Sequence, residues 1–281
     1  MLRQHVFQAV PEPYWAPGDG YRGESAAQAP RYNHLLAALP PEDYERLLPH
    51  LEPVRLPPGA TLHRAGDREP YLYFLTEGIV SRCCGAQDGT SVGSAVTGCE
   101  GVIGVASFLG GESTPCGAEV VSAGHAYRLP SRILKEEFSR GGALQHLLLR
   151  YTQALITQMA QTAACNRYHS VEQQLCRWLL LSLDRLPTDE VGMTQELIAN
   201  TLGVRREGVT EAAGKLQAAG LIHYRRGRIE VLDRPGLEAR ACECYAIVKR
   251  EYDRLLRNFD FPERPRAAPA ALAPIGALQP A

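Results

Sequence analysis

The sequence predicts an α+β chain that begins with an antiparallel β-roll of jelly-roll type, continues through one long helix and ends in a winged helix-turn-helix. Three observations predict this order. Short apolar runs separated by glycine turns extend from Val54 to about Leu129, as in a closed or two-layered antiparallel sheet. A helical apolar repeat follows Gly142. A capped helix, a Gly turn, a second helix and a basic hairpin lie between Met193 and Asp233.

Length and charge agree with this organisation. The 281 residues exceed one small domain and fit two domains with tails. Hydrophobic residues make up 45% of the chain, enough for ordinary globular cores. The net charge of −1 hides an asymmetry, because residues 31–140 hold 10 basic and 13 acidic side chains whereas residues 193–257 hold 12 and 9. The C-terminal part is therefore the better candidate for binding a polyanion.

The N-terminal part is expected to start with a flexible arm over residues 1–30, which is rich in Pro and Gly and has no amphipathic period. It resembles no signal peptide, and no apolar run of about 20 residues follows, so a cytoplasmic protein without a membrane partner is expected. A short helical segment capped by Asn33 should open the β-roll domain of residues 31–141.

The β-roll has a family resemblance. Leu56–Asp67, with Gly59 and Gly66, and Tyr71–Val80, with Gly78, resemble the opening strands of the cyclic-nucleotide-binding-domain superfamily. The resemblance implies a sensor domain of that fold.

Residues 142–168 should form a long dimerisation helix. Its apolar stripe recurs at spacings of three and four residues, which suits a parallel partner helix. The alternative is that the stripe only packs on its own β-roll. The predicted dimer contacts are Leu144, Leu148, Tyr151, Leu155, Met159 and Thr162.

Residues 169–258 are predicted to fold as the DNA-binding domain with an extra C-terminal helix. Ser170 and Gln173 have the spacing of a capping box at the start of its first helix. Thr194 can cap the next helix, and Gly203 supplies the left-handed turn residue between two crossing helices. The pattern closely resembles the Crp-type winged helix, so the chain resembles the Crp/Fnr family over residues 31–235.

The resemblance implies where DNA is contacted. Arg206 matches a residue that addresses guanine or phosphate, and Glu207 one that accepts from cytosine. Arg205 stands where a capping Ser is usual, and Glu211 where many members carry a second base-reading Arg, so the operator sequence is not implied. The predicted DNA-contacting residues are Thr194, Gln195, Val204, Arg205, Arg206, Glu207, Gly208, Thr210, Glu211, Lys215, Arg225, Arg226 and Arg228.

The sensor departs from nucleotide-binding relatives. Val105 stands at the place of their Glu, and Pro115 and Cys116 stand at the place of their Arg-Ser pair. A phosphate pocket without its guanidinium loses its bidentate partner, so no cyclic-nucleotide binding is expected and the effector is unknown.

No cofactor and no metal site are expected. Cys83 and Cys84 point to opposite faces of a strand, and Cys242 and Cys244 are about 200° apart on an assumed continuous helix. Most of the cysteines are expected to stay reduced and buried, with Cys99 and Cys116 as redox candidates. Haem ligation by His63 or His125 stays open. No catalytic motif is present, which predicts a protein that is not an enzyme.

After the hairpin, one helix is expected from Pro235 to about Phe259, followed by a flexible tail over residues 259–281. The whole pattern predicts a homodimeric transcription regulator that binds palindromic double-stranded DNA and contacts RNA polymerase. The alternatives are a non-sensing adaptor that binds nucleic acid unspecifically, and a thiol redox enzyme that uses Cys83 or Cys116.

Overall fold

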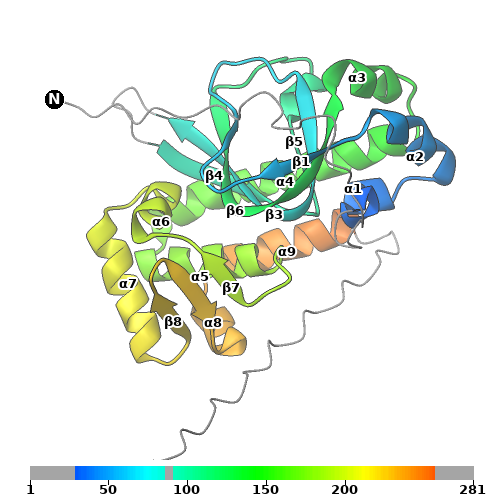
Figure 1. Ribbon diagram of the computed structural model, residues 1–281. Coiled ribbons are helices and arrows are strands. Elements are labelled where there is room, and N and C mark those ends of the chain that lie inside the picture. The colour runs from blue at the N-terminus through cyan, green and yellow to red at the C-terminus, as the bar shows by residue number, and fades with distance from the viewer. Residues whose placement is uncertain (1–28, 86–90, 257–281) are drawn as a thin grey trace, which may run out of the picture.

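The computed structural model describes residues 29–85 and 91–256. The tail expected over residues 259–281 lies outside the described residues, and so does the arm expected over residues 1–30 except for its last two residues. One of the glycine turns expected in the β-roll, at Asp88-Gly89, also lies outside them. Figure 1 shows the β-roll above, the small helical domain below, and the long helix α4 (Ala143–Tyr168) between them. No helix in the described part combines the length and apolar character that crossing a membrane requires.

The N-terminal helical segment closes one end of the β-roll. It consists of η2 (Pro30–Tyr32), α1 (His34–Ala37), α2 (Pro41–Leu47) and η3 (Leu48–His50). Asn33 caps α1 as predicted, because its Oδ1 accepts from the backbone N–H groups of Leu35 and Leu36. Its side-chain amide donates to the carbonyls of Leu75 and Gly101, which joins this segment to two parts of the roll.

The β-roll is antiparallel throughout, as predicted. Its strands are β1 (Glu52–Leu56), β2 (Thr61–His63), β3 (Tyr71–Gly85), β4 (Ser91–Thr97), β5 (Val102–Ile103) and β6 (Cys116–Pro130), with the 3-10 turn η4 (Val105–Ser107) after β5. The sheet order is β1-β6-β3-β4, with β2 on β6 and β5 on β3. Register shifts in the long β3–β6 pair bend both strands, so that one sheet curls into a roll.

Three helices lead from the roll into the second domain. α3 (Ser131–Ser139) is followed by α4 and then by α5 (Val171–Leu183). The predicted capping box at Ser170 and Gln173 is confirmed. α5 is buried along most of its length, because it packs against the winged helix and both C-terminal helices.

The winged helix-turn-helix has one strand more than predicted. Its elements are β7 (Glu190–Gly192), α6 (Gln195–Leu202), α7 (Arg206–Ala218), β8 (Ile222–Arg225) and β9 (Arg228–Val231), and the sheet order is β7-β9-β8. Only the two hairpin strands were predicted. β7 was missed because it is three residues long, and only Val191, opposite Ile229, is buried.

The single C-terminal helix predicted from Pro235 to Phe259 is wrong. The chain forms α8 (Arg234–Arg240) and α9 (Glu243–Leu256), and Ala241 between them is extended. Asp233 caps α8 by accepting from the N–H of Gly236. α9 then runs back along α4, as Figure 1 shows.

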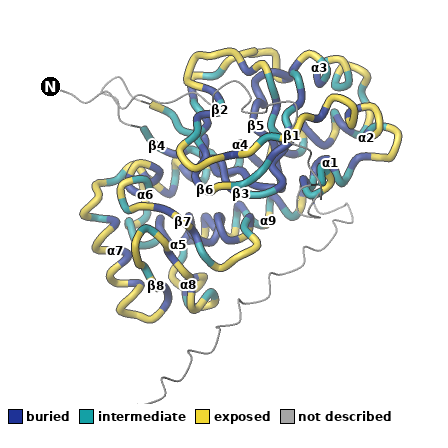
Figure 2. The backbone as a smooth tube through the Cα atoms, viewed as in Figure 1, coloured by how far each residue is buried: buried dark blue, intermediate teal, exposed yellow. Residues whose placement is uncertain are grey.

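The stripe that was predicted to contact a partner helix is turned into the chain itself. Leu144, Leu148, Tyr151, Leu155 and Thr162 are buried within the chain itself, and Met159 is half-buried against the same core. The Tyr151 hydroxyl is 3.1 Å from the hydroxyl of Thr97 on β4. α4 therefore uses this stripe to pack within its own chain, and Figure 2 shows buried residues where α4 passes between the two domains.

Candidate nucleic-acid interface

The turn between α6 and α7 has the predicted geometry. The Thr194 side chain caps α6 by accepting from the N–H of Leu197. Gly203 ends α6 with φ +67°. A Cβ at Gly203 would lie 2.8 Å from Cγ2 of Val92 on β4, so the position requires glycine both for its backbone conformation and for its close contact with the β-roll.

The start of α7 is exposed and basic. Arg205 is its N-cap residue and provides no side-chain capping hydrogen bond, in agreement with its departure from the usual Ser. Arg205, Arg206 and Glu207 are all exposed, whereas Val209, Ala212 and Leu216 face the core. The sequence therefore places guanidinium groups on the outer face of a firmly packed helix.

The wing, which we define as β8, β9 and their turn, adds further cations. Its turn residues Arg226 and Gly227 have φ +50° and +76°, the left-handed conformations of a two-residue hairpin turn. Arg225 and Arg228 face each other across the hairpin. An arginine with positive φ costs folding free energy, and such residues are concentrated at functional sites.

Four of the predicted cations make no ion pair within the described chain, and the others do. Arg205, Arg206, Arg225 and Arg226 have no carboxylate within 4.0 Å among residues 29–85 and 91–256. Lys215 lies 2.8 Å from a Glu211 oxygen, and Arg228 lies 2.7 Å from a Glu190 oxygen, so both are partly neutralised.

The helix start and the wing form one surface. The wing turn docks at the start of α6, where the Gly227 carbonyl accepts from the N–H of Met193 at 2.7 Å. Thr210 on α7 donates to the Gln195 side chain on α6 at 2.9 Å. Burial raises the pKa of Tyr224 on β8, and the positive charge of Arg206 opposes this shift. Of the predicted contact residues, Val204 is half-buried against the core and Gly208 is half-buried, so neither has a freely exposed surface.

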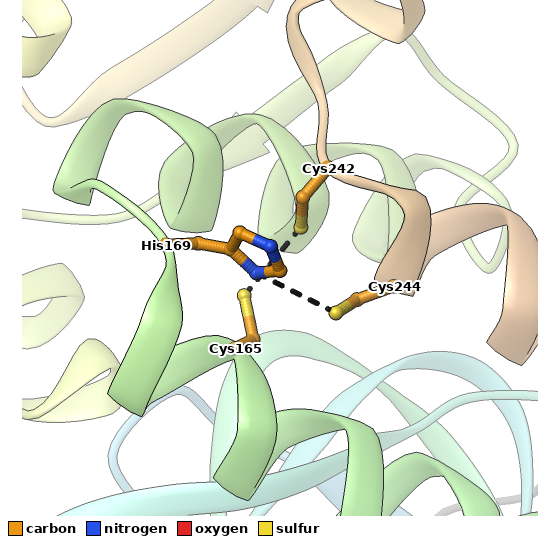
Figure 3. Close-up of side chains that lie close together, drawn as sticks. All are labelled: Cys165, His169, Cys242 and Cys244. Atoms are coloured by element: carbon orange, nitrogen blue, oxygen red, sulfur yellow. Dashed lines mark hydrogen bonds between the residues drawn. The ribbon is translucent and has the colours of Figure 1, made fainter.

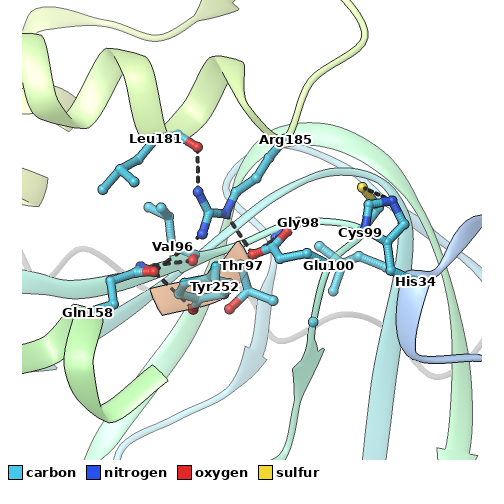
Figure 4. A network of polar contacts seen from close by, with 12 residues as sticks. His34, Val96, Thr97, Gly98, Cys99, Glu100, Gln158, Leu181, Arg185 and Tyr252 are labelled. Atoms are coloured by element: carbon cyan, nitrogen blue, oxygen red, sulfur yellow. Dashed lines mark hydrogen bonds and ion pairs between the residues drawn. The ribbon is translucent and has the colours of Figure 1, made fainter. Parts of the chain in front are cut away.

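A buried polar network joins this domain to the β-roll, as Figure 4 shows. Arg185, just after α5, donates to Glu100 in the β4–β5 turn at 2.6 Å and to the Leu181 carbonyl at 2.6 Å. Gln158 on α4 donates to the Val96 carbonyl on β4 and accepts from the hydroxyl of Tyr252 on α9. Burial lowers the pKa of Arg185, but the charge and hydrogen bond of Glu100, together with Tyr252 and Asp184, outweigh it and the net pKa is raised. Sequence reasoning missed these residues, because they come from four separate elements.

A cleft of about 300 Å³ lies beside this network, between α1, the β4–β5 turn and α9. Cys99, Glu100, Asp184, Lys249 and Asp253 are among its lining residues. The Cys99 Sγ is 3.5 Å from Nε2 of His34 in its wall.

The interior of the β-roll holds ionisable side chains, which are unusual in a core. His63 Nε2 and Glu69 Oε1 are 3.4 Å apart without hydrogen-bond geometry, and Arg82 is buried close enough to act on the charges of both. Burial, assisted by Arg82, lowers the pKa of His63 to about 4, so this histidine is neutral at pH 7. The other haem candidate, His125, lies 3.2 Å from the Glu77 carboxylate.

The cysteines differ from the expectation in two places. Cys84 and Cys116 face each other across β3 and β6 and are disulfide-bonded, while the other six cysteines form no disulfide within the described residues. Cys165, Cys242 and Cys244 gather with His169 where α4 ends and α9 begins, as Figure 3 shows. The prediction that Cys242 and Cys244 lie about 200° apart was wrong, because it assumed one continuous helix. In the structure Cys242 precedes the first residue of α9. The i, i+4 spacing of Cys165 and His169 was the signal that could have revealed the group.

Comparison with known proteins agrees with this architecture. The family model described as "Cyclic nucleotide-binding domain" matches residues 53–140, and the one described as "Crp-like helix-turn-helix domain" matches residues 173–240. No curated protein sequence matches the chain.

Solved structures show the same fold. A putative Crp/Fnr-family transcriptional regulator from Eubacterium rectale has a TM-score of 0.59 at 18% identity, over 74% of this chain and 98% of its own. FixK2 from Bradyrhizobium japonicum has a TM-score of 0.60 at 16% identity, over 68% and 98%. A CRP-family transcriptional regulator from Thermus thermophilus has a TM-score of 0.56 at 22% identity, over 67% and 96%.

A cyclic-nucleotide-binding-type β-roll followed by a Crp-like helix-turn-helix defines a class of two-domain DNA-binding transcription regulators. With both domains in this order, the chain belongs to the Crp/Fnr family.

Proposed function

We propose that this protein is a sequence-specific transcription regulator that binds an inverted-repeat operator as a homodimer and has no enzymatic activity. The observation that carries the proposal is the surface formed by the start of α7 and the wing, where Arg205, Arg206, Arg225 and Arg226 are exposed and unpaired within the described chain. Such groups suit phosphates and the O6 and N7 acceptors of guanine in a major groove.

The homodimer is proposed on a different face of α4 from the one first predicted. An exposed stripe follows spacings of three and four residues, the repeat of a two-helix coiled coil. Leu149 and Ile156 on it are 45% and 54% exposed, which is unusual for large apolar side chains. The stripe consists of His146, Leu149, Gln153, Ile156, Ala160 and Ala163.

Dimerisation through this stripe would give the twofold symmetry that an inverted repeat requires. Two recognition helices would then enter successive major grooves, about 34 Å apart. We further propose that the regulator acts in the cytoplasm, where it would meet both the operator and RNA polymerase.

The sensor is proposed to respond to something other than a cyclic nucleotide. Val105 is buried in η4, and Cys116, at the place of a phosphate-binding residue in relatives, is joined to Cys84. The Glu100–Arg185 contact and the Val92–Gly203 contact offer two routes by which a change in the β-roll would reach α6 and α7. Calorimetry with cyclic AMP should give no binding heat, and micromolar binding would refute this part.

The DNA-binding proposal is tested by selection from a random-sequence duplex library, followed by footprinting. The expected result is an enriched inverted repeat and a protected site that covers both halves. Uniform, salt-sensitive binding without an enriched sequence would support the unspecific adaptor instead and would refute the proposal.

The residue-level test compares two arginine variants with the same change in charge. Arg206→Ala should weaken binding to the selected operator by roughly 1–3 kcal/mol. Arg250→Ala is the control, because Arg250 is exposed on α9, outside the proposed interface. Equal affinities of the two variants for the operator would contradict the assignment of α7 as the reading helix.

A further inference from the structure

A group of four potential metal ligands joins the end of α4 to the start of α9. Cys165 lies in the last turn of α4, and His169 is the residue that ends it. Cys242 lies in the α8–α9 junction, and Cys244 in the first turn of α9. Figure 3 shows the three sulfur atoms and the imidazole ring pointing toward one another from these two places.

The distances between the ligand atoms match a tetrahedral site. Cys165 Sγ and Cys242 Sγ are 3.6 Å apart, and so are Cys244 Sγ and His169 Nδ1. All four ligand atoms lie within 4.8 Å of one another. With Zn–S bonds of about 2.3 Å and Zn–N bonds of about 2.05 Å, a tetrahedron has S–S edges of about 3.8 Å and S–N edges of about 3.6 Å.

Burial also distinguishes this group from ordinary core cysteines. Cys165, Cys242 and Cys244 form a small buried cluster of their own, whereas Cys176 is part of the main apolar core. Three thiols that contact mainly one another contribute little as apolar packing. Their arrangement is the one expected of ligands around a common centre.

The surroundings suit a bound cation with three thiolate ligands. The Nε2 atom of His169 lies 3.3 Å from a Glu243 carboxylate oxygen, which leaves Nδ1 to face the cysteines. A histidine whose second nitrogen donates to a carboxylate is the usual arrangement at protein zinc sites. Three thiolates and Zn²⁺ leave a net charge of −1, and the buried Arg177 guanidinium is near enough to act on Cys165 and Cys244.

The ligand set selects among metals. Sulfur and nitrogen ligands without an oxygen exclude magnesium and calcium, which require oxygen donors. An iron–sulfur cluster places its ligands around a larger inorganic core, so ligand atoms within 4.8 Å of one another fit a single ion. Four protein ligands leave no open position, as in a structural site.

We propose that Cys165, His169, Cys242 and Cys244 bind one Zn²⁺ ion in a closed site that fixes the end of α4 to the α8–α9 junction. This inference goes beyond the proposed regulatory function and does not depend on it. The ion would hold the DNA-binding domain in a set orientation to α4, at the point where the chain passes from one to the other.

The first test measures metal in the full-length protein purified under reducing conditions. Elemental analysis should give one zinc per chain. Removal by a strong chelator should expose three additional thiols to a thiol reagent. The zinc-free protein should take up one Co²⁺ per chain and show the visible absorption bands of tetrahedral cobalt with thiolate ligands.

Variants locate the site. Cys244→Ser and Cys165→Ser should each lose the stoichiometric zinc and the cobalt bands. Cys99→Ser is the matched control, because Cys99 is also a buried cysteine outside the disulfide but lies in the β-roll, and this variant should keep both the zinc and the cobalt bands. Unaltered zinc in Cys244→Ser would overturn the proposal. Wild-type protein that holds no zinc and takes up no Co²⁺ ion would also overturn it. The same conclusion would follow from a Cys165–Cys242 disulfide, or from an iron–sulfur chromophore, in place of the zinc ion. The cobalt titration uses wild-type protein, so the proposal stays testable if a variant does not fold.

Discussion

The Glu100–Arg185 ion pair should be among the most important polar contacts for stability. Arg185 is 5% exposed, so solvent screens the pair little. Replacing Arg185 by Met keeps much of its volume. Within the described residues it leaves the Glu100 carboxylate, 13% exposed, with the backbone N–H of Gly98 as its remaining hydrogen-bond donor. Removing one partner of a buried pair costs roughly 3–5 kcal/mol, and we expect a loss in that range for Arg185→Met.

The double variant Glu100→Gln/Arg185→Met separates the ion pair from simple packing. Gln removes the unpaired charge, so the double variant should recover roughly 2–3 kcal/mol of the single variant's loss. Urea unfolding followed by circular dichroism gives the free energies of unfolding for all four members of the cycle. Additive losses in the cycle, or a cost of less than about 1 kcal/mol for Arg185→Met, would refute the reasoning.

Three further predictions concern other parts of the chain. Ile156→Arg should be a monomer in light scattering, with little change in its free energy of unfolding. Leu232→Arg, at a similarly exposed apolar residue on the other domain, should stay dimeric. If both variants are dimeric, the proposed stripe is not the dimer contact. Arg226→Gly should relieve about 1 kcal/mol of backbone strain. The same variant should bind DNA more weakly, and its affinity should depend less on salt concentration. An unchanged salt dependence would show that the wing does not contact the DNA. The folded pKa of His63, about 4, is below the unfolded value of 6.5, so stability from this group is complete above pH 6.5 and is lost as pH falls toward 4. Between about pH 8 and pH 5 the wild type should lose about 2 kcal/mol more than His63→Gln in urea unfolding, and equal losses would show that His63 is not buried as a neutral ring.

Local signals in the sequence predicted many of the helices and turns. The cap at Thr194, the left-handed Gly203 and the capping box at Ser170 each depend on a few neighbouring residues, so they can be recognised without knowing the fold. The extended chain at Ala241 was missed because apolar residues on both sides continued a helical pattern.

Contacts between distant segments were beyond sequence reasoning. The stripe of α4 had the right period, but period alone does not tell whether a helix faces its own β-roll or a partner. The α4–α9 contact decides which faces remain open, and it depends on where the chain turns after α8. The same turn brings Cys242 to Cys165 across 77 positions in the chain.

The apolar core extends without interruption from Leu35 near the N-terminus to Leu256 at the end of α9. Although two domains can be named, their interiors share side chains along α4 and α5. A fragment cut at Ser170 would expose the apolar faces of α5 and α9 to water, and we expect it to aggregate. Each domain of this regulator is therefore better studied by substitutions in the full-length chain than by expressing the two halves separately.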